Sequence, residues 1–191
     1  MLGGDLLNIA VTSKAEILRQ CRLLVAEKGM TALTMRAVAQ RCGVALGSLY
    51  NYFPSKTDLS LGVIESVWQD IFHLEGCEND ACPFPDYVQR LFCRVEAGMR
   101  AYPRFFAAHS LSFASEEKGK ARETMERYFA HMQEGLRHAL DSDRAVRGDA
   151  FDASLTRAAL AEFTLSTLVS LWVRHSPDCQ VLIELLRRAL Y

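Results

Sequence analysis

Uncharged hydrogen-bonding side chains fill the segment between Arg41 and Lys56. These 14 residues include no Asp, Glu, Lys or Arg, and their polar groups are hydroxyls and one amide, among them Ser48 and Asn51. Such groups can donate to and accept from the edges of nucleic-acid bases, whereas the nearby cations Arg36 and Lys56 can hold phosphates. The spacing therefore predicts base reading by neutral groups and backbone attraction by the cations on either side.

Two short helices joined by a turn must position these groups. Thr34 is a good N-cap for the first helix, and Gly43 ends it because glycine takes the left-handed conformation at no steric cost. The second helix is predicted over Leu46–Phe53 and stops at Pro54, since the residue before a proline is pushed out of the helical region. A helix, a glycine turn and a second short helix make the unit that places its second helix in the DNA major groove.

The segment LTMRAVAQRCGVALGSLYNYFPSKTDL resembles the signature of the TetR family of bacterial transcriptional regulators. In that family a glycine-valine turn precedes a small hydroxyl residue, Leu, Tyr, one variable residue, Tyr or His, and Phe, and a Lys then starts the fourth helix. The resemblance covers Ser13 to Leu61, and beyond it only helical character and length agree. Ala45 departs from the pattern where a capping Ser or Thr is usual, and Leu46 departs where Lys or Gln is frequent.

The resemblance implies contacts between this motif and operator DNA. The residues expected at the DNA backbone are Met35, Arg36, Tyr50, Tyr52 and Lys56. Met35 and Arg36 lie in the first turn of the first motif helix, where free backbone N–H groups can hold a phosphate. The residues expected at base edges are Gly47, Ser48 and Asn51, with Leu46 either at a thymine methyl or packed inward.

Helical periodicity continues through the rest of the chain, without any strand pattern. We therefore expect an all-α fold of about nine helices in two domains. Residues 1–58 form a three-helix DNA-binding head, and residues 59–191 form a helical effector-binding and dimerisation body. The predicted helices are 13–28, 34–42, 46–53, 59–74, 86–102, 103–113, 116–140, 151–175 and 177–190.

Composition describes an ordinary globular chain, with 50% hydrophobic and 24% charged residues among 191. The net charge of -1 is unevenly spread. Residues 1–60 carry seven Lys and Arg against four Asp and Glu, or +3, so the remaining residues carry -4. A basic head on an acidic body is typical of a DNA-binding module joined to a module of another kind, although ordinary charge fluctuation also produces such a split.

No segment is expected to address the chain to a membrane or to cross one. The longest uncharged run is the 14-residue segment described above, which is polar and too short to span a bilayer. The first residues, MLGGDLLNIAV, lack a basic region before their apolar stretch. We therefore expect a cytoplasmic protein without a membrane partner.

Six cysteines are expected to be reduced in that compartment. Cys21, Cys42 and Cys93 occur at helical core spacings and are expected to act as small hydrophobic residues. Cys77 and Cys82 lie in a predicted loop, where they are either plain loop residues or a thiol or metal sensor. Four residues separate them instead of two, and no nearby His or Cys completes a metal site.

The last two predicted helices indicate self-association. Residues 163–173 are apolar nearly all round the helix, and residues 182–189 carry a second apolar stripe. In TetR-like proteins the two C-terminal helices pair with their symmetry mates. The resemblance therefore implies a homodimer on palindromic half-sites about 34 Å apart. The predicted interface residues are Leu165, Leu168, Trp172, Leu182 and Leu186, and the alternative is that both helices are buried within one subunit.

Large apolar side chains are frequent in the predicted body, which is typical of a ligand cavity or of an ordinary core. The candidate effector-pocket residues are Trp68, Phe72, Tyr102, Phe105, Phe106, His109, Tyr128 and Phe163. His109 and Tyr128 supply the polar groups of this set. The expected effector is small and largely apolar.

These observations favour a ligand-responsive transcriptional regulator, most simply a repressor that its effector releases from the operator. No cofactor, metal or enzymatic activity is expected. His131, Glu134 and His138 share a helix face at positions i, i+3 and i+7, but the charged residues around them favour a solvated face. The alternative class is a helical enzyme or interaction protein that retains the motif.

Overall fold

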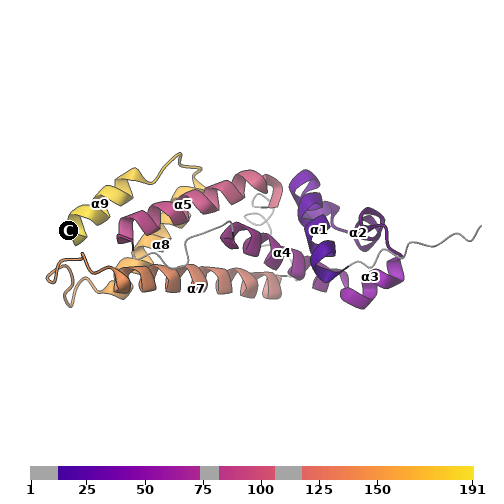
Figure 1. The fold of residues 1–191 in the computed structure, drawn as a ribbon, viewed down its shortest axis with the longest axis horizontal. Coiled ribbons are helices and arrows are strands. Elements are labelled where there is room, and N and C mark those ends of the chain that lie inside the picture. Colours follow the sequence, from indigo (N-terminus) through magenta and orange to yellow (C-terminus); the bar gives the residue numbers. More distant parts are fainter. Residues whose placement is uncertain (1–12, 74–81, 106–117) are drawn as a thin grey trace, which may run out of the picture. The chain divides into compact units, whose positions relative to one another are not determined.

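The structure is a computed structural model that describes residues 13–73, 82–105 and 118–191. Within these ranges the chain is helical, without a strand; eight α-helices and one 3-10 helix have defined bounds, and residues 103–105 are also helical (Figure 1). The all-α prediction is therefore confirmed. The elements are α1 (Lys14–Lys28), η1 (Met30–Ala32), α2 (Met35–Cys42), α3 (Leu46–Tyr52), α4 (Lys56–His73), α5 (Phe84–Ala101), α7 (Lys118–Ser142), α8 (Arg157–Val173) and α9 (Gln180–Leu190).

The described residues divide into two compact units. Unit 1 contains residues 13–69, 101–105 and 118–120, and unit 2 contains residues 70–73, 82–100 and 121–191. Helix α4 runs without a break through the boundary expected between residues 58 and 59. Its start is fixed just before that point, because the Asp58 N–H donates to Ser55 Oγ at 3.1 Å and the Ser55 hydroxyl donates to the Asp58 carboxylate at 2.7 Å.

Unit 1 is organised around helix α1. The Glu16 N–H donates to Ser13 Oγ at 3.1 Å and caps the start of this helix. Arg22 donates to Ser66 Oγ at 2.5 Å, which joins α1 to α4. The buried residues of α1 are Ile17, Cys21, Leu24 and Val25. Helix α1 also packs against α2, and α2 packs against α3, so tertiary contacts stabilise two helices that are too short to be stable alone.

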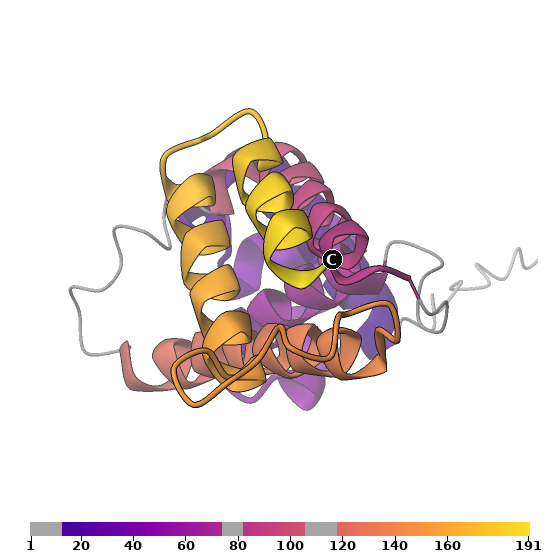
Figure 2. The same ribbon diagram turned by 90° about the vertical axis from the view of Figure 1, so that its left-hand side faces the viewer.

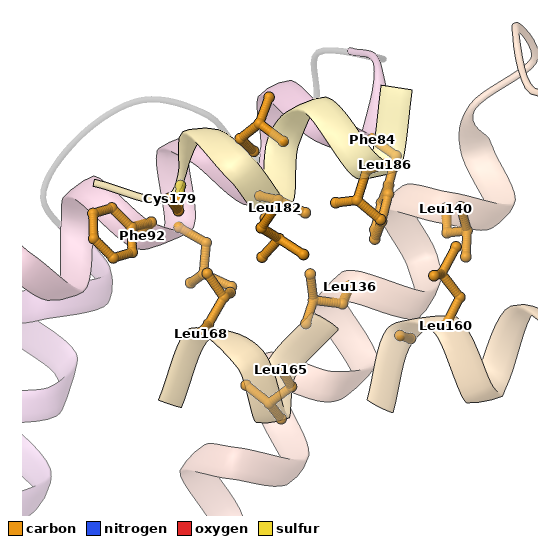
Figure 3. Packing of buried hydrophobic residues seen from close by; sticks show 14 of the residues in the cluster. Phe84, Phe92, Leu136, Leu140, Leu160, Leu165, Leu168, Cys179, Leu182 and Leu186 are labelled. Carbon is orange, nitrogen blue, oxygen red and sulfur yellow. The ribbon is translucent and has the colours of Figure 1, made fainter. Parts of the chain in front are cut away.

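Unit 2 encloses one hydrophobic core between helices α5, α7, α8 and α9. Helices α8, α9 and α5 lie side by side, and α7 crosses them (Figure 2). Figure 3 shows Leu136 of α7, Leu168 of α8 and Leu182 of α9 pointing into this core. Each of the three side chains is at most 4% exposed. Four helix faces that the sequence separates widely therefore share a single apolar interior.

Two residues from distant parts of the chain hold the start of α5. The Phe84 N–H donates to Asp143 Oδ2 at 2.7 Å, and the Tyr191 hydroxyl donates to the same carboxylate. Burial acts to raise the pKa of Asp143, but the hydrogen bonds from Tyr191 and the backbone outweigh it and lower the pKa. The carboxylate is therefore ionised at neutral pH.

Some helix boundaries differ from the predicted ones. Helix α8 begins at Arg157 instead of residue 151, because the Asp152 carboxylate accepts from the N–H groups of Ser154 and Leu155 at 2.7 and 2.8 Å. These bonds make a turn, and Thr156 then caps the helix. Most of the helix expected at 103–113 lies outside the described residues.

Candidate DNA-binding surface

Helix α2 carries the first part of the candidate surface, and its two ends are fixed by specific residues. The Ala37 N–H donates to the hydroxyl of Thr34 at 3.1 Å, so Thr34 is the N-cap. Gly43 takes the left-handed conformation, with φ 65° and ψ 29°, and its N–H donates to the Gln40 carbonyl at 3.2 Å. A larger residue would be strained at Gly43. The predicted cap and glycine turn are thus confirmed.

Helix α3 buries one side and exposes the other. Leu49 is fully buried, and Phe53, which follows the helix, is 2% exposed. The exposed residues of α3 are Leu46, Gly47, Ser48, Tyr50 and Asn51. Nothing lies within 4 Å of the place where a Cβ at Gly47 would be, so another molecule can approach the backbone closely there. Leu46 is 36% exposed, which favours an outward position over inward packing.

Two exposed cations flank this neutral face. Within the described residues, the side chains of Arg36 and Lys56 make neither a hydrogen bond nor an ion pair. Arg41 differs, because its guanidinium donates to both carboxylate oxygens of Glu27 at 2.7 and 2.8 Å. These hydrogen bonds lower the pKa of Glu27. Arg41 thus holds α2 against α1, whereas Arg36 and Lys56 are available to phosphates.

Two of the residues predicted to contact the DNA backbone, Met35 and Tyr52, have side chains that are buried or half-buried. The Met35 side chain is 7% exposed and packs in unit 1, so only its backbone N–H, in the first turn of α2, is available to a phosphate. The Tyr52 side chain is half-buried and lines an open groove of about 380 Å³. Lys14 lines the same groove, with its ammonium 5.5 Å from the centre of the Phe53 ring. Sequence patterns did not reveal this position of Lys14 beside the end of α3.

The candidate effector residues fall into both units. In unit 1, Trp68 and Phe105 are buried and meet edge to face, with ring centres 6.3 Å apart, and Tyr102 is 7% exposed. In unit 2, Tyr128 is half-buried and Phe163 is 57% exposed on α8. Phe106, His109 and the side chain of Phe72 lie outside the described part of the structure. Of the predicted set, the structure therefore brings Trp68 and Phe105 into contact.

The side chains predicted for the dimer interface are buried inside unit 2. Their exposed fractions are 8% for Leu165, 0% for Leu168, 8% for Trp172, 4% for Leu182 and 2% for Leu186. They belong to the hydrophobic core of this unit. The large apolar side chains that α8 and α9 expose are Phe163, Val173, Val181 and Leu185, at 57%, 70%, 76% and 57%. An apolar pattern on all sides of a helix does not reveal which side faces inward.

The other candidate chemical groups form no cluster in the described part of the chain. His131, Glu134 and His138 are exposed, and Glu134 is engaged by Arg137 at 2.8 Å. No group of three or more His, Cys, Asp or Glu side chains among the described residues could hold a metal ion. Cys77 lies outside those residues. Likewise, none of the helices described is both long and apolar enough to cross a membrane.

A capped helix, a left-handed glycine turn and a helix with an exposed neutral face, flanked by unpaired cations, define a helix-turn-helix DNA-binding protein. Residues 13–63 match the family model of bacterial regulatory proteins, tetR family. These residues therefore carry the DNA-binding domain of the tetR family of bacterial regulatory proteins. A chain with this domain is a DNA-binding transcriptional regulator.

Relatives of known description extend the likeness beyond the motif. The nucleoid occlusion factor SlmA of Vibrio cholerae serotype O1 is 25% identical over 149 residues, which cover 75% of this chain and 74% of SlmA. The HTH-type transcriptional repressor KstR of Rhodococcus jostii is 29% identical over 137 residues, which cover 68% of this chain and 64% of KstR. The chain thus spans somewhat less than two thirds of KstR.

Solved structures share the fold over most of this chain. BioQ, solved with its double-stranded DNA operator, matches with a TM-score of 0.55 and 16% identity, covering 93% of this chain and 96% of BioQ. A second structure, described as the molecular basis for control of antibiotic production by bacterial hormones, matches with a TM-score of 0.59 and 21% identity. This match covers 92% of this chain and 96% of the chain in that structure. These likenesses confirm the all-α architecture.

Proposed function

We propose that this regulator is a homodimeric repressor that a small, largely apolar effector releases from a palindromic operator. The observation that carries the proposal is the neutral exposed face of α3 between the unpaired cations Arg36 and Lys56. Cations without an internal partner lose no ion pair when they meet a phosphate, whereas Arg41 would have to leave Glu27. The name of KstR, a transcriptional repressor, supports repression over activation.

Within this proposal the face of α3 enters the major groove. Ser48 and Asn51 contact base edges, and Gly47 permits close approach. The backbone is held by Arg36, Lys56, Tyr50, Tyr52 and the N–H of Met35. Since hydroxyls and one amide read the bases, we expect modest discrimination of about 1 kcal/mol per contacted base pair. Affinity is expected to fall steeply with salt because phosphate contacts release counterions.

Operator binding tests this arrangement directly. The operator is first selected from random DNA with the full-length protein. The triple variant Ser48→Ala, Tyr50→Phe, Asn51→Ala is expected to lose sequence preference. Arg36→Ala is expected to weaken binding to all sequences and to reduce the salt slope by about 1. Arg19→Ala is the matched control, because Arg19 is already paired with Glu16 at 2.7 Å. Unchanged preference in the triple variant would overturn the groove assignment.

The homodimer is proposed to form through the outer faces of α8 and α9. These faces carry Phe163, Val173, Val181 and Leu185, and such an apolar surface on consecutive helices is typical of a self-complementary interface. Leu185→Glu is expected to be a monomer in sedimentation, with a helix content by circular dichroism that is unchanged. Leu23→Glu is the matched control, because Leu23 is 42% exposed on α1 and should leave the dimer intact. A dimeric Leu185→Glu variant would contradict this interface.

The effector is proposed to bind beside Trp68, which is 3% exposed and contacts Phe105. The chain has two tryptophans, so Trp172→Phe leaves Trp68 as the single indole reporter. Compounds that release the operator should change the fluorescence of this variant. Release of the operator without any change in Trp68 fluorescence would place the effector elsewhere.

The likeness to SlmA supports a second candidate, a nucleoid occlusion factor. The two candidates differ in what binding does. A repressor binds beside the genes that it regulates, and its deletion raises their transcripts. Binding sites spread along the chromosome, with unchanged transcripts of adjacent genes after deletion, would favour the second candidate.

A further inference from the structure

Two thiols of unit 2 are joined through one amide side chain. Gln89 Nε2 donates to the sulfur of Cys93 at 3.4 Å, and the Cys179 thiol donates to Gln89 Oε1 at 3.7 Å. Gln89 and Cys93 lie one turn apart on α5, whereas Cys179 immediately precedes α9. The amide group therefore stands between two sulfur atoms that come from separate helices.

The two thiols have opposite surroundings. Cys93 is exposed, so the expectation that it lies in the core is wrong, because the side of α5 that carries it faces away from the interior. Cys179 is 2% exposed and lies at the start of α9, close to Phe92 of α5 (Figure 3). Burial, followed by the nearness of Cys93, raises the pKa of Cys179 to about 11. A dissolved oxidant can therefore reach Cys93, while Cys179 stays protonated and shielded.

We propose that Cys93 and Cys179 form a reversible disulfide when the protein meets a hydroperoxide. The Cys93 thiolate attacks one oxygen of the hydroperoxide and the O–O bond breaks, so that Cys93 becomes a sulfenic acid and the departing hydroxide or alkoxide takes a proton from the solvent to give water or an alcohol. The sulfur of Cys179 then attacks the sulfur of Cys93, the S–O bond breaks, and water leaves with the proton of Cys179. The two thiols lose two electrons in total, the hydroperoxide gains them, and an external thiol reverses the reaction.

The amide of Gln89 must move aside for the disulfide to form. Gln89 Oε1 also accepts from Gln180 Nε2 at 3.3 Å, so its departure removes hydrogen bonds between α5 and the first turn of α9. Val181 and Leu185 follow on α9 and belong to the proposed dimer surface. Oxidation thus acts on the helix through which the protein is proposed to dimerise, and this last step alone rests on the proposed function.

Peptide mapping of the full-length protein tests the disulfide. After hydrogen peroxide treatment and alkylation, a non-reduced digest should contain the Cys93–Cys179 cross-linked peptide, which dithiothreitol removes. Cys93→Ser should abolish the cross-link and leave Cys179 reduced, while Cys82→Ser, the matched control, should not affect it. Gln89→Ala should speed its formation because the intervening amide is gone.

Other oxidation products would overturn the proposal. They are a Cys93–Cys93 link between chains and irreversible sulfinic acid at Cys93. The proposal would also fail if Cys179 of the treated protein remained a free thiol, fully alkylatable after denaturation. Sedimentation of the oxidised protein forms a separate arm. A disulfide without any change in self-association would overturn the effect on α9 and leave the cross-link itself established.

Discussion

The pairs α2–α3 and α8–α9 both carry a surface for another molecule, but they are anchored very differently. Helix α3 has one buried side chain, Leu49, and its exposed face is neutral and polar. Helices α8 and α9 insert ten buried side chains into unit 2, yet they expose large apolar groups. With Met35, Val38 and Ala39 of α2, the helices of the proposed DNA-binding surface bury four side chains in all, whereas those of the proposed self-association surface bury ten.

The largest expected effect separates the inner and outer sides of α8. Leu168→Ala removes a fully buried side chain and should lower the free energy of unfolding by about 2–5 kcal/mol, because a cavity remains where it packed. Ser170→Ala on the exposed side should change it by less than about 0.5 kcal/mol. Urea denaturation at a fixed protein concentration measures both. Similar values for the two variants would contradict the orientation of α8.

A glycine in each unit gives the next contrast. Gly98→Ala places a Cβ 2.6 Å from Cγ1 of Ile71, so overpacking should cost about 1–3 kcal/mol of stability. Gly47→Ala on α3 meets no atom within 4 Å and should stabilise the helix by up to about 1 kcal/mol. Operator affinity should nevertheless fall in Gly47→Ala, because its methyl group lies where the DNA approaches. Unaltered affinity would place Gly47 outside the DNA interface.

The bond between Tyr191 and Asp143 tests the anchoring of α5. Tyr191→Phe should lower stability by about 1 kcal/mol at pH 7. Because the pKa of Asp143 is lowered in the folded state, its contribution is present above its unfolded value of about 3.9 and is lost as the pH falls through the folded value. Thermal unfolding from pH 7 to pH 3 should therefore show the difference between wild type and variant shrinking below about pH 4. A constant difference would separate this bond from the ionisation of Asp143.

The smallest effect concerns one methyl group on the DNA. If Leu46 contacts a thymine methyl, replacing thymine by deoxyuridine at that position should weaken wild-type binding by about 0.8 kcal/mol, or roughly fourfold. Leu46→Ala should be insensitive to the same replacement. Equal losses in both proteins would show that Leu46 does not contact the methyl.

The two helix pairs also differ in how well the sequence predicts them. In α3 a single buried row, together with the stop at Pro54, indicates at once which side faces outward. In α8 apolar residues surround the axis, so nothing in the pattern separates the buried Leu168 from the exposed Val173. The prediction for Cys93 was wrong for the same reason, because a small sulfur-containing residue fits the inner or the outer side of α5 equally well.

Turns that side-chain hydrogen bonds stabilise were also not predicted from the sequence. Asp152 has no helical neighbour that reveals its role, and its carboxylate delays the start of α8 by binding two backbone N–H groups. The helix ends at Thr34 and Gly43 were predicted correctly, because a capping hydroxyl and a left-handed glycine each act within one turn of the chain. Features that depend on distant partners, such as the bond between Phe84 and Asp143, require the folded chain.

The hydrogen bonds that join Phe84, Asp143 and Tyr191 also affect the order in which the two units fold during protein synthesis. Helices α1, α2 and α3 contact one another within 52 residues, and Arg22 of α1 bonds to Ser66 of α4, so most of unit 1 can form before unit 2 is synthesised. Unit 2 needs α9 and Tyr191 before its core closes. Until α9 is synthesised, unit 1 can be folded while the core of unit 2 is incomplete. During that interval the apolar residues of α8 that later pack in this core are exposed to contact with other chains.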